Sequence, residues 1–180
     1  MNLTKKQLEY HRQKWINRGI TRPPFAKETT KDQESVWDYP RPPAILKDTR
    51  HVKVLINGTL VADSKNTMRV LETASPPTFY IPKEDVKTEL LTEIPNKQSL
   101  CEWKGLATYY SYNSKVVGWT YKSPFEQFNE IASHIAFYAS CGTCMVDGET
   151  VVPQPSDFYG GWVTSEVVGP FKGEPGTSGW

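Results

Sequence analysis

The chain has 180 residues, of which 38% are hydrophobic and 23% are charged, so it has enough apolar side chains to bury a core, which excludes a mainly disordered protein. No apolar stretch approaches the ~20 residues that a membrane-spanning helix needs, and the first residues carry Lys and Arg where a signal peptide is apolar. Three cysteines cannot form a closed disulfide framework. We therefore expect a soluble cytoplasmic protein without a membrane partner.

Positive charge is concentrated at the N-terminal end of the chain. Residues 1–31 hold eight Lys and Arg against two Glu, a net charge of +6, which leaves thirteen basic and eighteen acidic residues, a net charge of −5, for the rest. The basic segment could face a nucleic acid or an acidic surface of its own molecule. We favour the intramolecular or simply solvated arrangement and expect no nucleic-acid partner.

A helix is predicted over residues 5–18. Thr4 is a typical N-cap, and Gly19 followed by two prolines is a typical end. The apolar side chains of this helix form a narrow stripe of Leu8, Trp15 and Ile16. A narrow stripe indicates weak docking or a helix that awaits a partner, and residues 21–32 have the polar composition of a linker.

The middle of the chain has the alternation and turn residues of antiparallel β-structure. Val52, Val54 and Ile56 alternate with other residues, Asn57-Gly58 fits a type I′ turn, and residues 60–63 return as the second strand of a hairpin. Further strands are predicted at residues 68–72, 78–81, 107–112, 116–121, 134–138 and 145–152. Inside this region the only predicted helix is a short one over residues 124–133.

The predicted organisation has three parts. Residues 1–33 form a basic helical extension and linker, residues 34–152 form the β domain, and residues 153–180 form a tail rich in Gly and aromatic residues. We expect the tail to be ordered and to wrap around the domain, because Trp162, Phe171 and Trp180 would otherwise expose a large apolar area.

Two segments combine aromatic rings with a cation, a pattern that suits contact with a planar or anionic ligand. The first is a proline-stiffened run with Trp37, Tyr39 and Arg41, and the second contains Trp103 and Lys104. The alternative interpretations are a proline-rich strand that covers the edge of the core and a hairpin turn with an exposed lysine. Glu72, between the two segments, could pair with either cation or act as a base.

The ordered motifs of the chain resemble one family. They are ESVWDYPRPP (residues 34–43), VLET (70–73), FYIP (79–82) with EDV (84–86), CEWKG (101–105), GWTY (118–121) and IAFY (135–138). This series is similar to the family called domain of unknown function 427. The tail, with FYGGWVTS (158–165) and VGPFKG (168–173), looks like that of the longer, cyanobacterial and fungal-type members.

The resemblance implies a mainly β fold of the Mss4-like or β-tent type, with two antiparallel sheets packed at an angle over a cleft. This type of fold serves zinc-binding, sulfoxide-reducing and ligand-binding proteins, so it does not select a function. A nucleotidyltransferase-like label is also attached to the family. The chain has neither the clustered carboxylates nor the Gly-Ser phosphate loop that metal-dependent nucleotidyl transfer needs.

We therefore expect a small-molecule site in the cleft, for a planar or anionic ligand, and leave open whether the protein is an enzyme. The expected ligand-binding residues are Trp37, Tyr39, Arg41, Tyr80, Trp103, Lys104, Trp119 and Tyr121. The candidates for a catalytic role are Glu72, Cys101 and Lys104. Rings would provide apolar contact, and the cations would orient an anionic group.

Two other functions remain open. Cys141 and Cys144 have the spacing of a zinc or redox pair, which Cys101 and His134 could complete, but one such pair is weak support, and we expect neither a metal nor a cofactor. Alternatively, the basic helix and the aromatic tail could dock a protein partner. The sequence does not indicate an oligomeric state.

Overall fold

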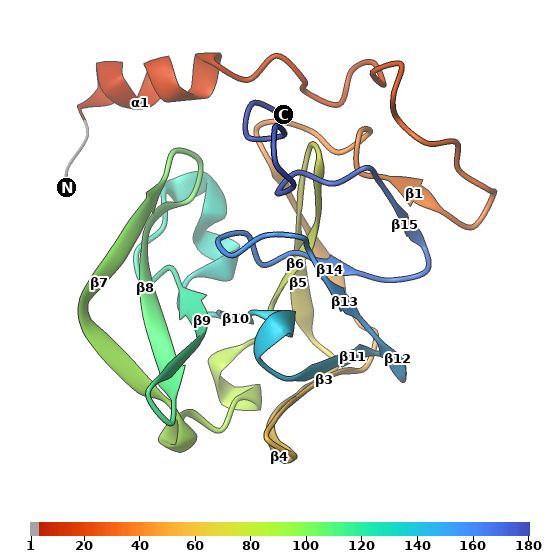
Figure 1. Ribbon diagram of the computed structural model, residues 1–180. Coiled ribbons are helices and arrows are strands. Elements are labelled where there is room, and N and C mark those ends of the chain that lie inside the picture. The colour runs from red at the N-terminus through yellow and green to blue at the C-terminus, as the bar shows by residue number, and fades with distance from the viewer. Residues whose placement is uncertain (1–3) are drawn as a thin grey trace.

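Three antiparallel sheets form the framework of the computed structural model, which describes residues 4–180 (Figure 1). The first contains β7 (Thr92–Cys101), β8 (Gly105–Tyr112), β9 (Lys115–Thr120) and β10 (Ile135–Phe137), in the order β10-β9-β8-β7. The second contains β2 (Ala44–Asp48), β5 (Thr67–Glu72) and β6 (Ser75–Tyr80), in the order β2-β5-β6. The third contains β3 (Val52–Ile56), β4 (Thr59–Ser64), β11 (Thr143–Val146) and β12 (Glu149–Thr150), in the order β12-β11-β3-β4. The predicted mainly β fold is confirmed.

The hairpin of β3 and β4 forms as the sequence predicts. Asn57 and Gly58 connect the strands with φ angles of 50° and 77°, the left-handed conformation that a type I′ turn requires at both positions. Ile56 pairs with Thr59 across the turn, and the side chains of Val52, Val54 and Ile56 are buried.

Strands β6 and β10 separate two hydrophobic clusters. Successive side chains of a strand point to opposite faces. Accordingly, Phe79 and Ile81 pack into a cluster with the third sheet, whereas Tyr80 between them packs with Trp119 on the other side. The second cluster fills the space between the first and second sheets. A residue at this boundary between the two clusters is therefore buried whichever way it points, which explains why all three residues of β10 (135–137) are apolar.

The N-terminal helix α1 (Lys5–Gln13) is shorter than predicted. Thr4 caps it as expected, in a reciprocal capping box with Gln7. The helix ends before Trp15 because that side chain turns to the β domain, where its Nε1 donates a hydrogen bond to Glu102 Oε1 at 2.6 Å. No side chain of α1 is buried, which agrees with the weak docking that its narrow stripe predicts.

The other helical elements are short 3-10 turns: η1 (Lys83–Asp85), η2 (Thr88–Leu90), η3 (Glu126–Ile131) and η4 (Ala139–Cys141). The internal helix predicted over residues 124–133 is η3, which has non-helical backbone at Phe128. Phe128 and Ile131 are both fully buried there. Packing of these side chains, rather than a continuous helical hydrogen-bond ladder, holds the segment in place.

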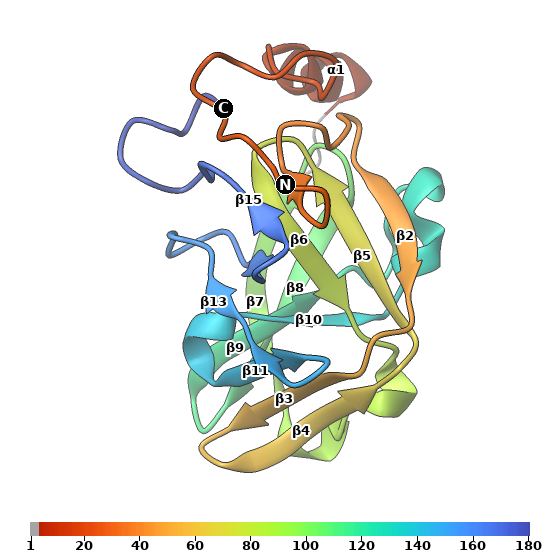
Figure 2. The ribbon, with the colours of Figure 1, turned by 90° about the vertical axis from the view of Figure 1, so that its right-hand side faces the viewer.

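The tail adds two small pairings to the β-structure. β14 (Trp162–Val163) pairs with β13 (Val152–Pro153), and β15 (Val167–Val168) runs parallel to β1 (Glu34–Ser35). Trp162 is fully buried and donates from Nε1 to the carbonyl of Phe137 at 2.9 Å. In Figures 1 and 2 the tail and the N-terminal extension lie beside each other above β5 and β6. Their contact includes the rings of Phe25 and Trp180, stacked 4.9 Å apart.

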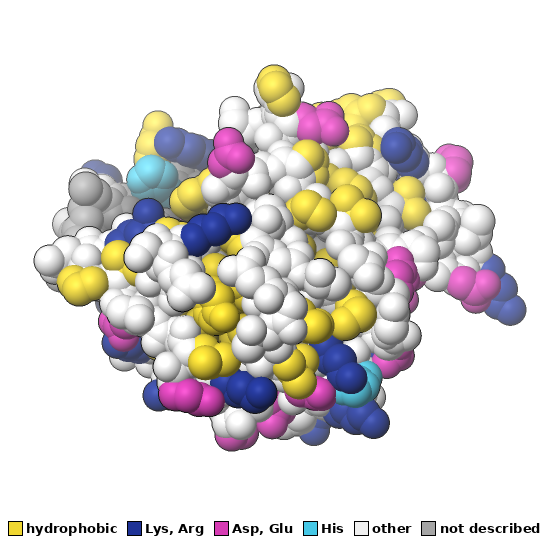
Figure 3. Space-filling model, turned by 60° about the horizontal axis from the view of Figure 1, so that its bottom comes forward, with side chains coloured by type: hydrophobic (Ala, Val, Ile, Leu, Met, Phe, Trp, Pro, Cys, Tyr) yellow, Lys and Arg dark blue, Asp and Glu magenta, His cyan; other side chains and the backbone are white. Residues whose placement is uncertain are grey.

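The face shown in Figure 3 presents hydrophobic, basic and acidic side chains together. Hydrophobic side chains gather near its centre, and basic and acidic side chains are mixed along its lower rim. Such mixing is typical of solvent-facing surface. None of the helices within residues 4–180 combines the length and apolarity needed to cross a membrane.

Candidate functional site

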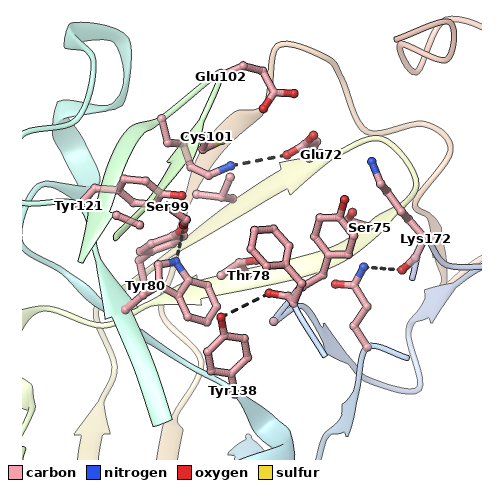
Figure 4. A pocket seen from close by; sticks show the side chains of 18 of the residues that line it. Glu72, Ser75, Thr78, Tyr80, Ser99, Cys101, Glu102, Tyr121, Tyr138 and Lys172 are labelled. Carbon is pink, nitrogen blue, oxygen red and sulfur yellow. Dashed lines mark hydrogen bonds and ion pairs between the residues drawn. The ribbon is translucent and has the colours of Figure 1, made fainter. Parts of the chain in front are cut away.

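A cavity of about 170 Å³ lies where the first and second sheets meet, and four parts of the chain line it. β5 and β6 contribute Glu72, Ser75, Thr78 and Tyr80, and the first sheet contributes Ser99, Cys101, Tyr109 and Trp119. Trp15 from the extension closes one side, and Gln154, Phe158, Tyr159 and Lys172 from the tail close another. Figure 4 shows Glu72 and Lys172 on one side of the cavity and Tyr80 and Tyr121 on the opposite side.

Aromatic rings form the inner wall of the cavity. Trp119 packs at 4.6 Å from the ring of Tyr138 and donates a hydrogen bond from Nε1 to Tyr80 Oη at 3.3 Å. Burial raises the pKa of Tyr80 to about 12, so its hydroxyl stays neutral and keeps its proton. At Gly160 the tail lies so close to this wall that a Cβ would be 2.3 Å from the Trp119 ring. The tail therefore packs directly against the Trp119 ring at the edge of the cavity.

A group of three charges, in which Arg41 and Lys104 are buried and Glu72 is partly buried, borders the aromatic wall. Glu72 lies between two cations: its Oε1 is 3.3 Å from Arg41 Nε, and its Oε2 is 3.5 Å from Lys104 Nζ. Burial by itself would lower the pKa of Lys104, but the attraction of neighbouring acidic groups, first Cys101 and then Glu72, outweighs burial and leaves that pKa raised. Lys104 is therefore protonated. With two cations and one carboxylate, the group carries a net charge of +1.

Lys172 is a second lysine of the cavity, and its surroundings differ from those of Lys104. Its Nζ lies 3.6 Å from the ring centroid of Trp15 and 5.1 Å from that of Tyr159. It donates a hydrogen bond to the main-chain oxygen of Trp180 at 3.1 Å. Burial first, and then the charge of Arg41, lower the pKa of Lys172 to about 8. Part of this amine is therefore neutral at physiological pH.

Trp15 is held over the cavity by polar contacts as well as by packing. Besides its hydrogen bond to Glu102, its ring faces the guanidinium of Arg41 at 4.4 Å. Arg12, one turn earlier, donates to the carbonyl of Glu102 at 2.8 Å. The basic extension thus contacts its own β domain, the arrangement favoured from the charge distribution.

The cavity brings together part of the residue set expected from the sequence. Tyr80, Lys104, Trp119 and Tyr121 all line it, as do Glu72 and Cys101. The three candidates for a catalytic role, Glu72, Cys101 and Lys104, are therefore neighbours in one cavity, although up to thirty-two positions separate them in sequence.

Four of the expected residues do not line the cavity. Trp37 and Tyr39 are buried in a separate cluster, where Trp37 Nε1 donates to the carbonyl of Pro170. Arg41 lies behind Glu72, and Trp103 is buried with Arg12 stacked over its ring at 5.3 Å. In the proline-rich run, the rings of Trp37 and Tyr39 cover the edge of the core, as in the alternative interpretation. Trp37 also packs against Trp180 in the tail.

Several cavity residues were not expected from the sequence. They are Trp15, Ser99, Tyr109, Tyr138, Tyr159 and Lys172. Tyr138 belongs to the IAFY motif and could have been chosen on that ground. Lys172 stands in Phe171-Lys172-Gly173, an aromatic–lysine–glycine sequence like the one around Lys104, so the same signal could have selected it.

The cysteines do not gather into one site. Cys144 is buried in the cluster of the third sheet, where burial raises its pKa to about 12, and Cys141 Sγ donates to the carbonyl of Val116 at 3.2 Å. Cys101 belongs to the cluster beside the cavity instead. His134 Nδ1 is 3.1 Å from the carbonyl of Ala132. Among residues 4–180, no group of three or more His, Cys, Asp or Glu is placed to hold a metal ion.

Comparison with known proteins identifies the family but no function. No curated protein matches the chain. Residues 44–152 match a family described as a domain of unknown function (DUF427), and this segment contains all three large sheets. Trp15, Tyr159 and Lys172 lie outside it, so flanking segments complete the cavity. Because the match covers more than half of its residues, the chain belongs to the DUF427 family.

Proposed function

We propose that the cavity binds a small planar molecule that carries an anionic group. The observation that carries this proposal is the combination of an aromatic wall with the largely buried, net positive group of Arg41, Glu72 and Lys104. Ligand sites in proteins are mostly apolar and have a few polar groups that fix the orientation of the ligand. This cavity has both components.

The volume of the cavity limits the size of the ligand. An engineered apolar cavity of roughly 150 Å³ accepts benzene. The cavity described here has about 170 Å³, so it suits one aromatic ring with small substituents. The rings of Trp119 and Tyr138 provide the faces against which such a ring can pack.

The charges determine which substituent is favoured. Glu72 can neutralise only one of its two cations, and Arg41 is further fixed by hydrogen bonds to the carbonyls of Asn17 and Thr73. Lys104 has no such backbone acceptors among the described residues, so its Nζ is the cation available to an incoming carboxylate. A charge-assisted hydrogen bond of this kind contributes about 1.5 to 3 kcal/mol.

Benzoate and its neutral analogue benzamide test the proposal. We expect benzoate to bind, to change the fluorescence of the cavity tryptophans, and to bind more tightly than benzamide. Lys104→Met should weaken benzoate roughly 10- to 100-fold, the equivalent of one charge-assisted hydrogen bond. The control is Lys115→Met, which changes an exposed lysine at the start of β9. Absence of benzoate binding, equal affinity for benzamide, or an unchanged affinity in Lys104→Met would contradict the proposal.

A further inference from the structure

We propose that the ligand of this cavity carries two anionic groups on one ring and that Lys172 binds the second of them. This inference rests on the proposed function and specifies the class of ligand further. Lys104 and Lys172 then have the same role at two places in the cavity, since each binds one anionic group.

The side chain of Lys172 is held at the cavity as a buried ammonium group. Its backbone N–H donates to the carbonyl of Ala74 at 2.7 Å, and its carbonyl accepts a hydrogen bond from Gln154 Nε2 at 2.6 Å. The residue is only 2% exposed, and it lines the cavity. Its Nζ lies 3.6 Å from the ring centroid of Trp15, a contact that favours the protonated form. The backbone contacts therefore fix a cation at the cavity wall.

Lys172 has no acidic side chain as a partner. None of the ion pairs within residues 4–180 includes it, whereas Lys104 pairs with Glu72. Within the same range its Nζ donates one hydrogen bond, to the main-chain oxygen of Trp180 at 3.1 Å, and that oxygen also accepts from Arg41 at 3.3 Å. An ammonium group has three donors. Lys172 therefore keeps donors for a ligand, and the oxygen that it contacts is shared between two cations.

Lys104 and Lys172 occupy separate positions in the cavity. Lys104 lies in the turn between β7 and β8 and is 3.5 Å from Glu72, whereas Lys172 lies on the tail, outside ion-pair distance of that carboxylate. Lys172 faces the ring of Tyr159 at 5.1 Å, and Figure 4 shows it on the opposite side of the cavity from Tyr80. Two anionic groups on one ring can therefore each meet a separate lysine.

The cost of the buried charge at Lys172 supports a role in binding. Burial first, and then the charge of Arg41, lower the pKa of Lys172, so its ammonium form is less stable here than in water. Glu72, Glu102 and Cys101 act in the opposite direction but do not cancel this effect. An anionic group of the ligand supplies the counter-charge that the free protein lacks. A residue that lowers stability in the free protein in this way is typical of a binding site.

Benzoate, the three isomers of benzenedicarboxylate and their monoamides test the inference. Each monoamide has the shape of its dicarboxylate but only one negative charge. We expect at least one dicarboxylate to bind roughly 10- to 100-fold more tightly than benzoate, the equivalent of one further charge-assisted hydrogen bond, and more tightly than its own monoamide. Isothermal titration calorimetry at neutral pH measures these affinities. The isomer that binds best indicates the spacing of the two lysines.

Lys172→Met removes the second cation and should bring the ratio of dicarboxylate to benzoate affinity close to one. The control Lys115→Met, at an exposed position, should keep the ratio of the parent protein. The ratio compares two ligands on the same protein, so partial unfolding of a variant affects both alike. If benzoate binds but no dicarboxylate exceeds it or its own monoamide, or if Lys172→Met keeps the parent ratio, this inference alone fails. If benzoate does not bind, the proposed function itself fails.

Discussion

Replacing Lys172 by methionine tests the buried amine through the stability of the protein, without any ligand. The pKa of Lys172 is lowered from 10.5 to about 8, chiefly by burial. Between these values the folded protein binds fewer protons than the unfolded chain. The free energy of unfolding contributed by this group therefore increases as the pH rises from about 8 to 10.5. Below about pH 8 the folded protein bears the full cost of a buried charge.

The magnitude follows from the two pKa values. Each tenfold change in proton affinity corresponds to about 1.4 kcal/mol, so the buried charge costs roughly 3 kcal/mol at neutral pH. Lys172→Met removes this cost but also removes the hydrogen bond to Trp180 and the contact with Trp15, worth about 1 kcal/mol each. The variant should therefore be more stable than the parent protein by about 1 kcal/mol at neutral pH. That difference should fall by about 2 kcal/mol between about pH 7 and about pH 9.5.

Urea unfolding followed by circular dichroism, repeated over this pH range on both proteins, measures the difference. Tyrosines and cysteines also titrate at high pH, but they are present in both proteins and cancel in the subtraction. Lys115→Met, at an exposed position, should show no pH-dependent difference. A difference between parent and Lys172→Met that stays constant with pH would refute the assignment of a depressed pKa to Lys172.

Three further predictions concern the framework of the cavity. Glu72→Gln should lower the free energy of unfolding, measured by urea titration, by less than the roughly 3–5 kcal/mol of a fully buried pair, because Arg41 and Lys104 lose a counter-charge whose side chain is 21% exposed. Trp162→Ala should cost roughly 3–5 kcal/mol in the same assay, since this indole is fully buried. Prolonged dialysis against EDTA should leave the melting temperature unchanged; a lowered melting temperature, restored by zinc, would establish a structural metal.

The parts of the fold that could be predicted from the sequence are those whose signal is local. The hairpin around Asn57-Gly58 combines an alternating strand with the two residue types its turn requires. β7 was missed because it is a mostly exposed edge strand, and its pairing with β8 shifts register between Glu93 and Gln98, where Asn96 has a φ of 60°. An exposed, interrupted edge strand has no hydrophobic alternation to detect.

The candidate site could be predicted only in part for a different reason. A motif shows that a ring and a cation are near each other in sequence, but the direction of each side chain depends on the tertiary contacts. Lys104 points to the cavity, whereas Trp103 next to it is buried on Phe128 and its neighbours. The ring of Trp37 packs against the rings of Phe25 and Trp180, which come from opposite ends of the chain. No local pattern contains this information.

The contacts of Arg41 show how the flanking segments affect the charge next to the cavity. Its guanidinium donates to carbonyls of Asn17 in the extension, Thr73 after β5 and Trp180 in the tail, while its Nε pairs with Glu72. Without Arg41, Glu72 would neutralise Lys104 completely, and the group would lose its net positive charge. Arg41 and Lys172 both lie outside the segment that matches the family. The three large sheets and the rings of Tyr80, Trp119 and Tyr138 thus lie within the segment that matches the DUF427 family, whereas Arg41 and Lys172 are contributed by the flanking segments.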